Sequence, residues 1–279
     1  TNNNKNNNPA HVDHSAMFRR LRSFKSAITG TKLKVACPCP IEPELGASLA
    51  QGTVVLEEKS GSDSSPLPVI IFDWDDTLCP TWWIQKVMEP SLCRVAASTF
   101  YAALEAHARH VEAILRAAKK LGHVDIVTAG NKPWFELSAQ YLRGVNVSAL
   151  LKELDIVVYY AVIPNIVPEG ADGPTVAKRI VMAECLTRRS GIKGSWHALS
   201  IGDKKAEAAA LRECCKAQHS RVWRKPLCKT LLLPADPMLE DLSQTLQTLT
   251  PQLASLIGRR SDFDIDLKTL ATAANATPK

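Results

Sequence analysis

The sequence predicts an α/β fold, a doubly wound, Rossmann-like parallel sheet with no cap domain or only a minimal one. From residue 67 onward, short apolar runs rich in β-branched residues alternate with helical patterns. This alternation favours right-handed βαβ units. Several apolar runs end in acidic or hydroxyl residues, which is the edge where such sheets bind ligands. The fold class and the position of a candidate site therefore follow from the same pattern.

The expected elements follow in chain order. The apolar runs predict strands at residues 69–72, 124–128, 155–161, 197–201 and 229–233. The patterns between them predict helices at residues 92–121, 134–142, 175–189 and 204–217. A last helix repeats Leu at positions 239, 242, 246, 249, 253 and 256. Because a dimerising coiled coil needs more heptads than this, the leucine stripe is expected to pack on the sheet.

Residues 1–65 differ from the rest of the chain. They open with an Asn run, continue with a basic patch at residues 19–25 and end in Ser- and Pro-rich sequence. This composition buries too little apolar surface to order itself, so a disordered basic tail is expected. Residues 66–268 are expected to form the folded domain, and residues 269–279 a C-terminal tail. An amphipathic pattern at residues 17–28 leaves a membrane-surface or targeting role open beside that of a solvated tail.

The bulk composition limits the classes of function. The 279 residues are 46% apolar, with a formal net charge of +6 concentrated in the tail, and no nucleic-acid-binding motif accompanies the charge, so no nucleic acid is expected as a partner. No apolar run is long enough to span a bilayer. Eight cysteines indicate reduced thiols and a cytoplasmic protein, although a chain that begins at Thr1 leaves an N-terminal targeting segment open. The oligomeric state is not predicted.

The segment Asp73-Trp-Asp-Asp-Thr-Leu78 carries two carboxylates, Asp73 and Asp75, at the end of the first expected strand. A carboxylate nucleophile can divide phosphate ester hydrolysis into two steps, and a second carboxyl group can act as acid and base. A helix amino-terminal cap is the alternative interpretation of these residues. Cys79, which follows the segment, is expected to be a small buried residue rather than a redox group.

Three later strand ends or helix starts carry partners for this chemistry. Thr128 ends the second strand and can donate to a phosphoryl oxygen. Lys178, at the start of a helix, supplies a compact cation. Asp203 follows Gly202 at the end of the fourth strand and can bind magnesium through oxygen, and Glu207 lies four residues further on. Solvated surface side chains are the alternative for Lys178 and Glu207.

With these four motifs in this order, the chain resembles the haloacid dehalogenase-like (HAD) superfamily of phosphohydrolases over residues 67–267. The variant FDWDDTL followed by Pro-Thr-Trp-Trp83, with SIGD and SDFDIDL later in the chain, is similar to a eukaryotic subgroup. The resemblance implies Asp73 as nucleophile and magnesium ligand, and Asp75 as acid/base whose backbone carbonyl also binds the metal. It implies Thr128 and Lys178 as phosphate-binding residues and Asp203 as the remaining metal ligand. Lys204 and Lys205 depart from the small polar residues that many relatives carry there.

The resulting prediction is a Mg²⁺-dependent phosphohydrolase that forms an aspartyl-phosphate intermediate on a phosphorylated substrate. Neither stretch that could hold a lid, residues 78–124 or 129–178, leaves room for a separate domain, so a phosphoprotein or another large substrate is favoured. Trp82 and Trp83 are either an exposed apolar ledge for that substrate or buried residues. The alternatives are a catalytically silent binding or assembly subunit that keeps the fold, and a phosphotransferase or mutase.

Overall fold

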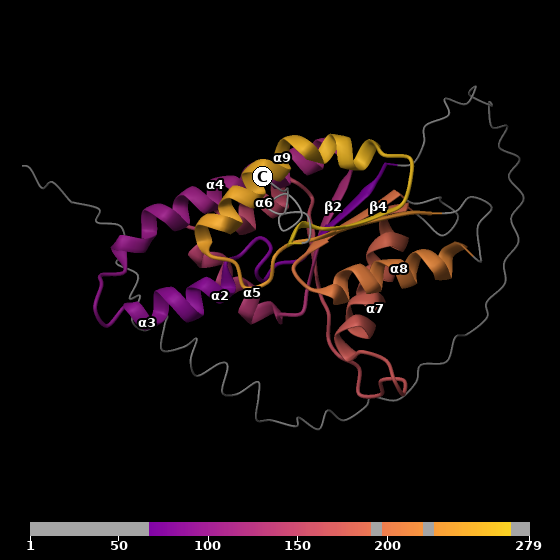
Figure 1. Ribbon diagram of the computed structural model, residues 1–279, viewed down its shortest axis with the longest axis horizontal. Helices are drawn as coiled ribbons and strands as arrows, with labels where there is room; N and C mark the ends of the chain where they lie inside the picture. The colour runs from indigo at the N-terminus through magenta and orange to yellow at the C-terminus, as the bar shows by residue number, and fades with distance from the viewer. Residues whose placement is uncertain (1–66, 191–196, 220–225, 269–279) are drawn as a thin grey trace, which may run out of the picture. The chain divides into compact units, whose positions relative to one another are not determined.

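The computed structural model describes residues 67–190, 197–219 and 226–268 (Figure 1). The predicted tails at residues 1–65 and 269–279 lie outside these ranges. Six strands form one sheet in the order β3-β2-β1-β4-β5-β6, and all neighbours pair in parallel. Chain order reverses between β1 and β4, and in such sheets the crevice beyond this point is where ligands bind. The strands are β1 (Val69–Phe72), β2 (His123–Thr128), β3 (Val157–Tyr160), β4 (His197–Gly202), β5 (Leu227–Leu232) and β6 (Phe263–Asp266).

Helices cover both faces of the sheet, which confirms the doubly wound prediction. In Figure 1, α4 and α9 lie together on one side of the sheet, and α7 and α8 pack against each other on the other side. No helix in the described part of the chain is long and apolar enough to cross a membrane. The helices are α2 (Thr81–Trp83), α3 (Glu89–Ser91), α4 (Ser98–Leu121), α5 (Lys132–Ser138), α6 (Val147–Glu153), α7 (Gly173–Ser190), α8 (Lys205–His219) and α9 (Leu239–Gly258), with a π-helical turn η1 (Ile84–Met88) and a 3₁₀ turn η2 (Ala139–Tyr141).

The hydrophobic core lies on both sides of the sheet around β1, whose four residues are all buried. Val69 and Ile71 pack with side chains of α7 and α8, such as Met182 and Leu211. Because side chains alternate along a strand, Ile70 and Phe72 face the other layer. The six leucines of α9 are all buried, and this helix lies along α4. The leucine stripe is therefore a packing surface of the domain itself.

Several elements differ from the sequence-based expectation. Residues 81–91 form the short helical turns α2, η1 and α3 rather than a single loop, and the long helix begins only at Ser98. Strand β3 begins at Val157 because Asp155 has a positive φ of 48° and closes the preceding turn. Helix α6 was not expected. Asn146 caps it by accepting a hydrogen bond from the N–H of Ala149.

Strand β6 was also not expected. It is a four-residue edge strand, Phe-Asp-Ile-Asp, and none of its residues is buried. Two aspartates in so short a segment hide the apolar alternation that marks a strand. The strand adds a sixth member beside β5 and leaves the reversal point between β1 and β4 unchanged.

No separate domain interrupts the described residues at the two places where a lid was considered. The chain between β1 and β2 is filled by α2, η1, α3 and α4. The chain between β2 and α7 is filled by α5, η2, α6, β3 and a loop. The prediction of no cap domain or only a minimal one is confirmed for this part of the chain.

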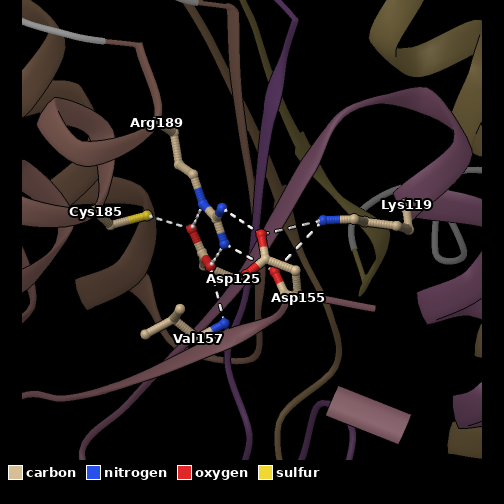
Figure 2. A network of polar contacts seen from close by, with 6 residues as sticks. All are labelled: Lys119, Asp125, Asp155, Val157, Cys185 and Arg189. Carbon is tan, nitrogen blue, oxygen red and sulfur yellow. Dashed lines mark hydrogen bonds and ion pairs between the residues drawn. The ribbon is translucent and has the colours of Figure 1, made fainter. Parts of the chain in front are cut away.

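Figure 2 shows a buried ion pair that joins α7 to the strands. Asp125, in the middle of β2, is fully buried and accepts hydrogen bonds from Nη2 of Arg189 at 2.6 Å and from Nε at 2.8 Å. It also accepts hydrogen bonds from the N–H of Val157 and the thiol of Cys185. Arg189 reaches Asp155 as well, at 2.9 Å. The cluster fixes the carboxyl-terminal end of α7 against β2 and β3, away from the strand ends.

Candidate active site

The loop after β1 is a wound turn held by its own backbone. Asp73 still belongs to the sheet, because its N–H donates to the carbonyl of Ile201 in β4. The carbonyl of Trp74 then accepts hydrogen bonds from the N–H groups of Leu78 and Cys79, at 2.9 and 2.8 Å. This winding turns the chain back on itself directly after the strand. The side chains of the loop therefore gather at the edge of the sheet.

Asp76 fixes the loop to the next helical turn. Its φ of 57° lies in the left-handed region, which Asp tolerates better than most residues. Its carboxylate accepts a 2.6 Å hydrogen bond from the N–H of Trp82. Burial raises the pKa of Asp76 to about 6, while the hydrogen bond from Trp82 opposes the shift. Asp76 thus shapes the loop on which the two candidate catalytic carboxyl groups sit.

Asp73 and Lys178 form a buried ion pair across the crevice. Nζ of Lys178 lies 2.5 Å from Oδ1 of Asp73 and 3.0 Å from Oε1 of Glu207, and it donates to the carbonyl of Val127. Burial alone would lower the pKa of Lys178, but the two carboxylates raise it overall, so the ammonium group stays charged. Among the described contacts, Lys178 engages only Oδ1 of Asp73. The second oxygen, Oδ2, has no described contact with Lys178.

Asp75 is held by two donors that sequence reasoning missed. Its Oδ1 accepts hydrogen bonds from the hydroxyl of Thr81 at 2.6 Å and from the indole N–H of Trp134 at 2.9 Å. The hydroxyl of Thr128 lies 3.4 Å from Oδ2. Burial raises the pKa of Asp75, and the hydrogen bonds from Thr81 and Trp134 oppose the shift. The Pro-Thr-Trp sequence just after the loop and Trp134 just after the second strand were the available signals, but neither residue type marks a site by itself.

Thr128 and Gly130 form the turn beneath Asp75. Thr128 is fully buried, and its hydroxyl oxygen accepts a hydrogen bond from the N–H of Gly130 at 2.9 Å. A Cβ added at Gly130 would lie 2.5 Å from Cδ1 of Trp134 and 3.4 Å from Oδ2 of Asp75. Glycine is therefore the residue that lets the indole ring reach the carboxyl group.

Asp203 occupies the end of β4, on the other side of the reversal point. Asp203 is only 5% exposed, and its Oδ1 is buried without a hydrogen-bond partner. The ammonium group of Lys204 lies 3.7 Å from Oδ2. Burial raises the pKa of Asp203 to about 7; Lys204 opposes this, and the neighbouring carboxylate of Asp73 adds to it. Burying a carboxylate oxygen without a partner, beside other carboxylates, lowers the stability of the protein when nothing is bound to that oxygen.

Glu207 links Lys178 to the start of α8. Besides the ion pair with Lys178, it accepts a 3.0 Å hydrogen bond from the backbone N–H of Lys204 through Oε2. This bond satisfies one of the free N–H groups at the helix start. Gly202 makes room for the contact, since a Cβ there would lie 2.8 Å from Cγ of Glu207. The alternative interpretation of Glu207 as a solvated surface charge is wrong, because the residue is 3% exposed.

The oxygen ligands at the strand ends suit magnesium. Hard carboxylate and carbonyl oxygens are what Mg²⁺ prefers, usually together with several waters. Asp73 and Asp203 supply carboxylates, and the carbonyl of Asp75 accepts none of the described loop hydrogen bonds. Within residues 67–190, 197–219 and 226–268, no group of three His, Cys, Asp or Glu side chains is arranged to hold a metal. The donor set therefore fits an ion bound by two carboxylates, one carbonyl and water.

The remaining residues singled out from the sequence lie around this centre in other roles. Cys79 is fully buried, as expected for a small apolar residue. Trp83 is 4% exposed and packs edge-on against Phe100, so it is not an exposed ledge. Trp82 is half-buried. Lys205 is exposed, and no ion pair of its side chain occurs within the described residues.

Comparison with known proteins adds little. No protein-family model matches the sequence, and no curated protein is significantly similar to it. Among solved structures, the crystal structure of a candidate HAD-like phosphatase from Mesorhizobium loti aligns with 68% of this chain and 91% of its own, at 16% identity and a TM-score of 0.31. Likeness at this level is shared by many unrelated proteins. The fold class therefore rests on the strand order and the helical layers of this chain.

Proposed function

We propose that this protein is a Mg²⁺-dependent phosphohydrolase of the HAD type that forms an aspartyl-phosphate on Asp73. The observation that carries the proposal is the arrangement at the reversal point of the sheet. There, a buried carboxylate pairs with Lys178 through one oxygen only, and the buried Oδ1 of Asp203 has no partner. Asp75 stands on the same loop, oriented by side-chain donors.

The chain's own residues account for both half-reactions. Oδ2 of Asp73 attacks phosphorus, and Asp75 gives its proton to the leaving oxygen as the ester bond breaks. Asp75 then takes a proton from water, whose oxygen attacks the same phosphorus and releases Asp73. Bound magnesium would neutralise charge on the phosphoryl oxygens, with Asp73, Asp203 and the carbonyl of Asp75 as its protein ligands. Lys178 holds Asp73 in position through their ion pair, and Thr128 can turn its hydroxyl to a phosphoryl oxygen.

We propose a phosphoprotein as the substrate class. The support is the lack of an inserted domain over the strand ends in the described residues, together with the partial exposure of Asp75. A site that is open at this edge admits a phosphate group displayed on a large body. A small sugar phosphate would be poorly enclosed there, and enclosure is how enzymes commonly exclude water from such substrates.

Replacing Asp73 by Asn tests the nucleophile. The amide keeps the shape but cannot attack, so hydrolysis of an aryl phosphate should fall by roughly three orders of magnitude or more. Activity should also require magnesium and disappear in excess chelator. Asp76→Asn is the matched control, because Asn tolerates the left-handed backbone and can still accept the hydrogen bond from Trp82. Full activity in Asp73→Asn, or in chelator, would contradict the proposal.

Replacing Asp75 by Asn separates the two half-reactions. Loss of acid and base help should slow turnover by roughly two to four orders of magnitude. With a good leaving group, attack needs less help than hydrolysis of the intermediate, so an acid-stable, hydroxylamine-sensitive phosphoprotein should accumulate. Mass spectrometry after rapid acid quench measures that species. Its absence in a variant that still turns over slowly would rule out the assigned role.

A further inference from the structure

A groove at the carboxyl end of β5 has a lining suited to polypeptide. It has a volume of about 500 Å³ and lies between the loop after β5 and the outer face of α9. Met238 and Leu249 give it an apolar part, while Gln244, Thr245 and Gln252 offer hydrogen-bonding groups. Its two charged lining residues in the described chain are Asp236 and Asp241.

The groove begins at the same edge of the sheet as the catalytic candidates, because β5 pairs with β4 in parallel and the lining loop follows the end of β5. The N–H of Leu233, where the loop begins, donates to the carbonyl of Gly202 at 2.7 Å, one residue before Asp203. The loop end of the groove therefore lies at the sheet edge that carries Asp203.

The dimensions of the groove fit a short extended segment. Its helical wall runs from Asp241 to Gln252, which corresponds to about 16 Å along the helix axis. An extended chain covers this length in about five residues. The lining residues of α9 recur every three or four positions, so they form one continuous face. The groove is long enough to contact several substrate residues on one side of a phosphorylated position.

The charge of the groove indicates which residue it would accept. Among the described residues, the carboxylates of Asp236 and Asp241 form no ion pair. Both residues are exposed. The φ of 53° at Asp236 fixes the loop that presents this side chain. Two unpaired carboxylates in one groove favour a cationic side chain and disfavour an anionic one.

We propose that this groove is the docking subsite for the polypeptide of the substrate, and that Asp236 and Asp241 select a basic residue near the phosphorylated position. The inference rests on the proposed phosphatase function and adds the sequence preference of its substrate. The phosphoryl group and its flanking residue would thus meet separate parts of one surface, the strand ends and the groove.

Phosphoserine peptides that differ at one position test the selection. The probes carry Arg, Ala or Glu two to four residues from phosphoserine and are otherwise identical. Across exposed charges, each carboxylate should favour Arg over Ala by about fivefold in kcat/KM, and the preference should weaken in high salt. Asp236→Asn and Asp241→Asn should each reduce the preference, and the double variant should remove it. Aryl phosphate hydrolysis should be unchanged in all of them.

Glu240→Gln is the matched control, because it removes the same charge from the first turn of α9 at a residue that does not line the groove. An equal loss of preference in Glu240→Gln would show a general charge effect and overturn the proposal. Unchanged Arg preference in the double variant would overturn it as well.

A binding measurement keeps the proposal testable if turnover fails. Fluorescence anisotropy of labelled, unphosphorylated Arg and Glu peptides on the full-length Asp73→Asn protein should show the same order of affinity. Equal affinities would overturn the groove assignment even in an active phosphatase. If only a variant ending at residue 268 binds the Arg peptide, the groove belongs to the chain's own end and the proposal fails. Arg-selective binding without phosphatase activity would support the groove and contradict the proposed function.

Discussion

At the scale of single residues, the contacts of Asp75 divide its two oxygens between different tasks. Oδ1 is engaged by Thr81 and Trp134, whereas Oδ2 has only the long contact to Thr128. The proposed function assigns proton exchange with the substrate to the oxygen that has fewer partners. Hydrogen bonds to a charged carboxylate contribute more than neutral ones, so each donor helps to fix this division.

Trp134→Phe should show whether the indole N–H positions Asp75. The ring remains, but one donor is lost, so we expect about a tenfold fall in kcat for a substrate with a poor leaving group. A substrate with a good leaving group needs little protonation and should lose much less. Comparing aryl and alkyl phosphates measures this difference. Trp82→Phe, which keeps the backbone contact to Asp76, should affect neither; an equal loss on both substrates would indicate a merely structural role for Trp134.

At the scale of elements, α7 carries two charged contacts with different consequences. Lys178, near its start, belongs to the candidate site, whereas Arg189, near its end, pairs with the buried Asp125 (Figure 2). The first contact sets the position of an ammonium group beside Asp73. The second anchors the helix to β2, so that the position of Lys178 does not depend on the loop before α7 alone.

Arg189→Met should destabilise the fold without changing the chemistry. It leaves the carboxyl group of Asp125 buried without its ionic partner, and such losses cost about 3–5 kcal/mol. Arg109→Met, which breaks an exposed pair with Glu105 on α4, should cost less than about 1 kcal/mol. Urea unfolding at neutral pH measures both free energies. Similar losses in the two variants would show that burial of the Asp125 pair does not matter.

At the scale of the whole molecule, His107 connects the loop after β1 with the two helices α4 and α9, which lie in one layer. The side chain of His107 projects from α4. Its Nε2 lies 2.9 Å from the carbonyl oxygen of Leu78, and its Nδ1 lies 2.9 Å from the hydroxyl oxygen of Ser243 in α9. Since a carbonyl only accepts, Nε2 carries the proton. The loop that holds Asp73 and Asp75 is thus tied to the packing of α4 against α9.

This contact predicts a dependence of stability on pH. Burial lowers the pKa of His107 from its ordinary 6.5 to about 4. The imidazole of His107 therefore binds a proton more tightly in the unfolded chain than in the folded one. Its contribution to the free energy of unfolding is complete above about pH 6.5 and is lost as the pH falls towards 4. The slope approaches about 1.4 kcal/mol per pH unit within this window.

His107→Gln should be less stable at neutral pH, and its difference from the wild type should shrink between pH 6.5 and 4.5. Denaturant unfolding at several pH values measures that difference, which removes the shared effect of other titrating groups. His110→Gln, on the same helix, is the control and should run parallel to the wild type. A constant difference for His107→Gln across this range would contradict the assignment.

The sequence by itself predicted the parallel sheet and the edge of the sheet at which the candidate site lies. Apolar runs ending at Asp73, Thr128 and Asp203 predicted parallel strands whose ends meet, because strand periodicity and the edge where ligands bind are local properties of the chain. The paired carboxylates and the lysine of the candidate site were also predicted from short sequence segments. The short strand β6 and helix α6 escaped because their apolar pattern is too brief to separate from loops.

Only the tertiary structure decided which side chains touch. Thr81 and Trp134 meet on Asp75 although they lie 53 positions apart in the sequence, and Glu207 is buried against Lys178 rather than solvated. The groove along α9 likewise combines the loop after β5 with residue Leu267. Such contacts depend on how layers pack and on which carboxylates find partners, and a one-dimensional pattern carries no information about either.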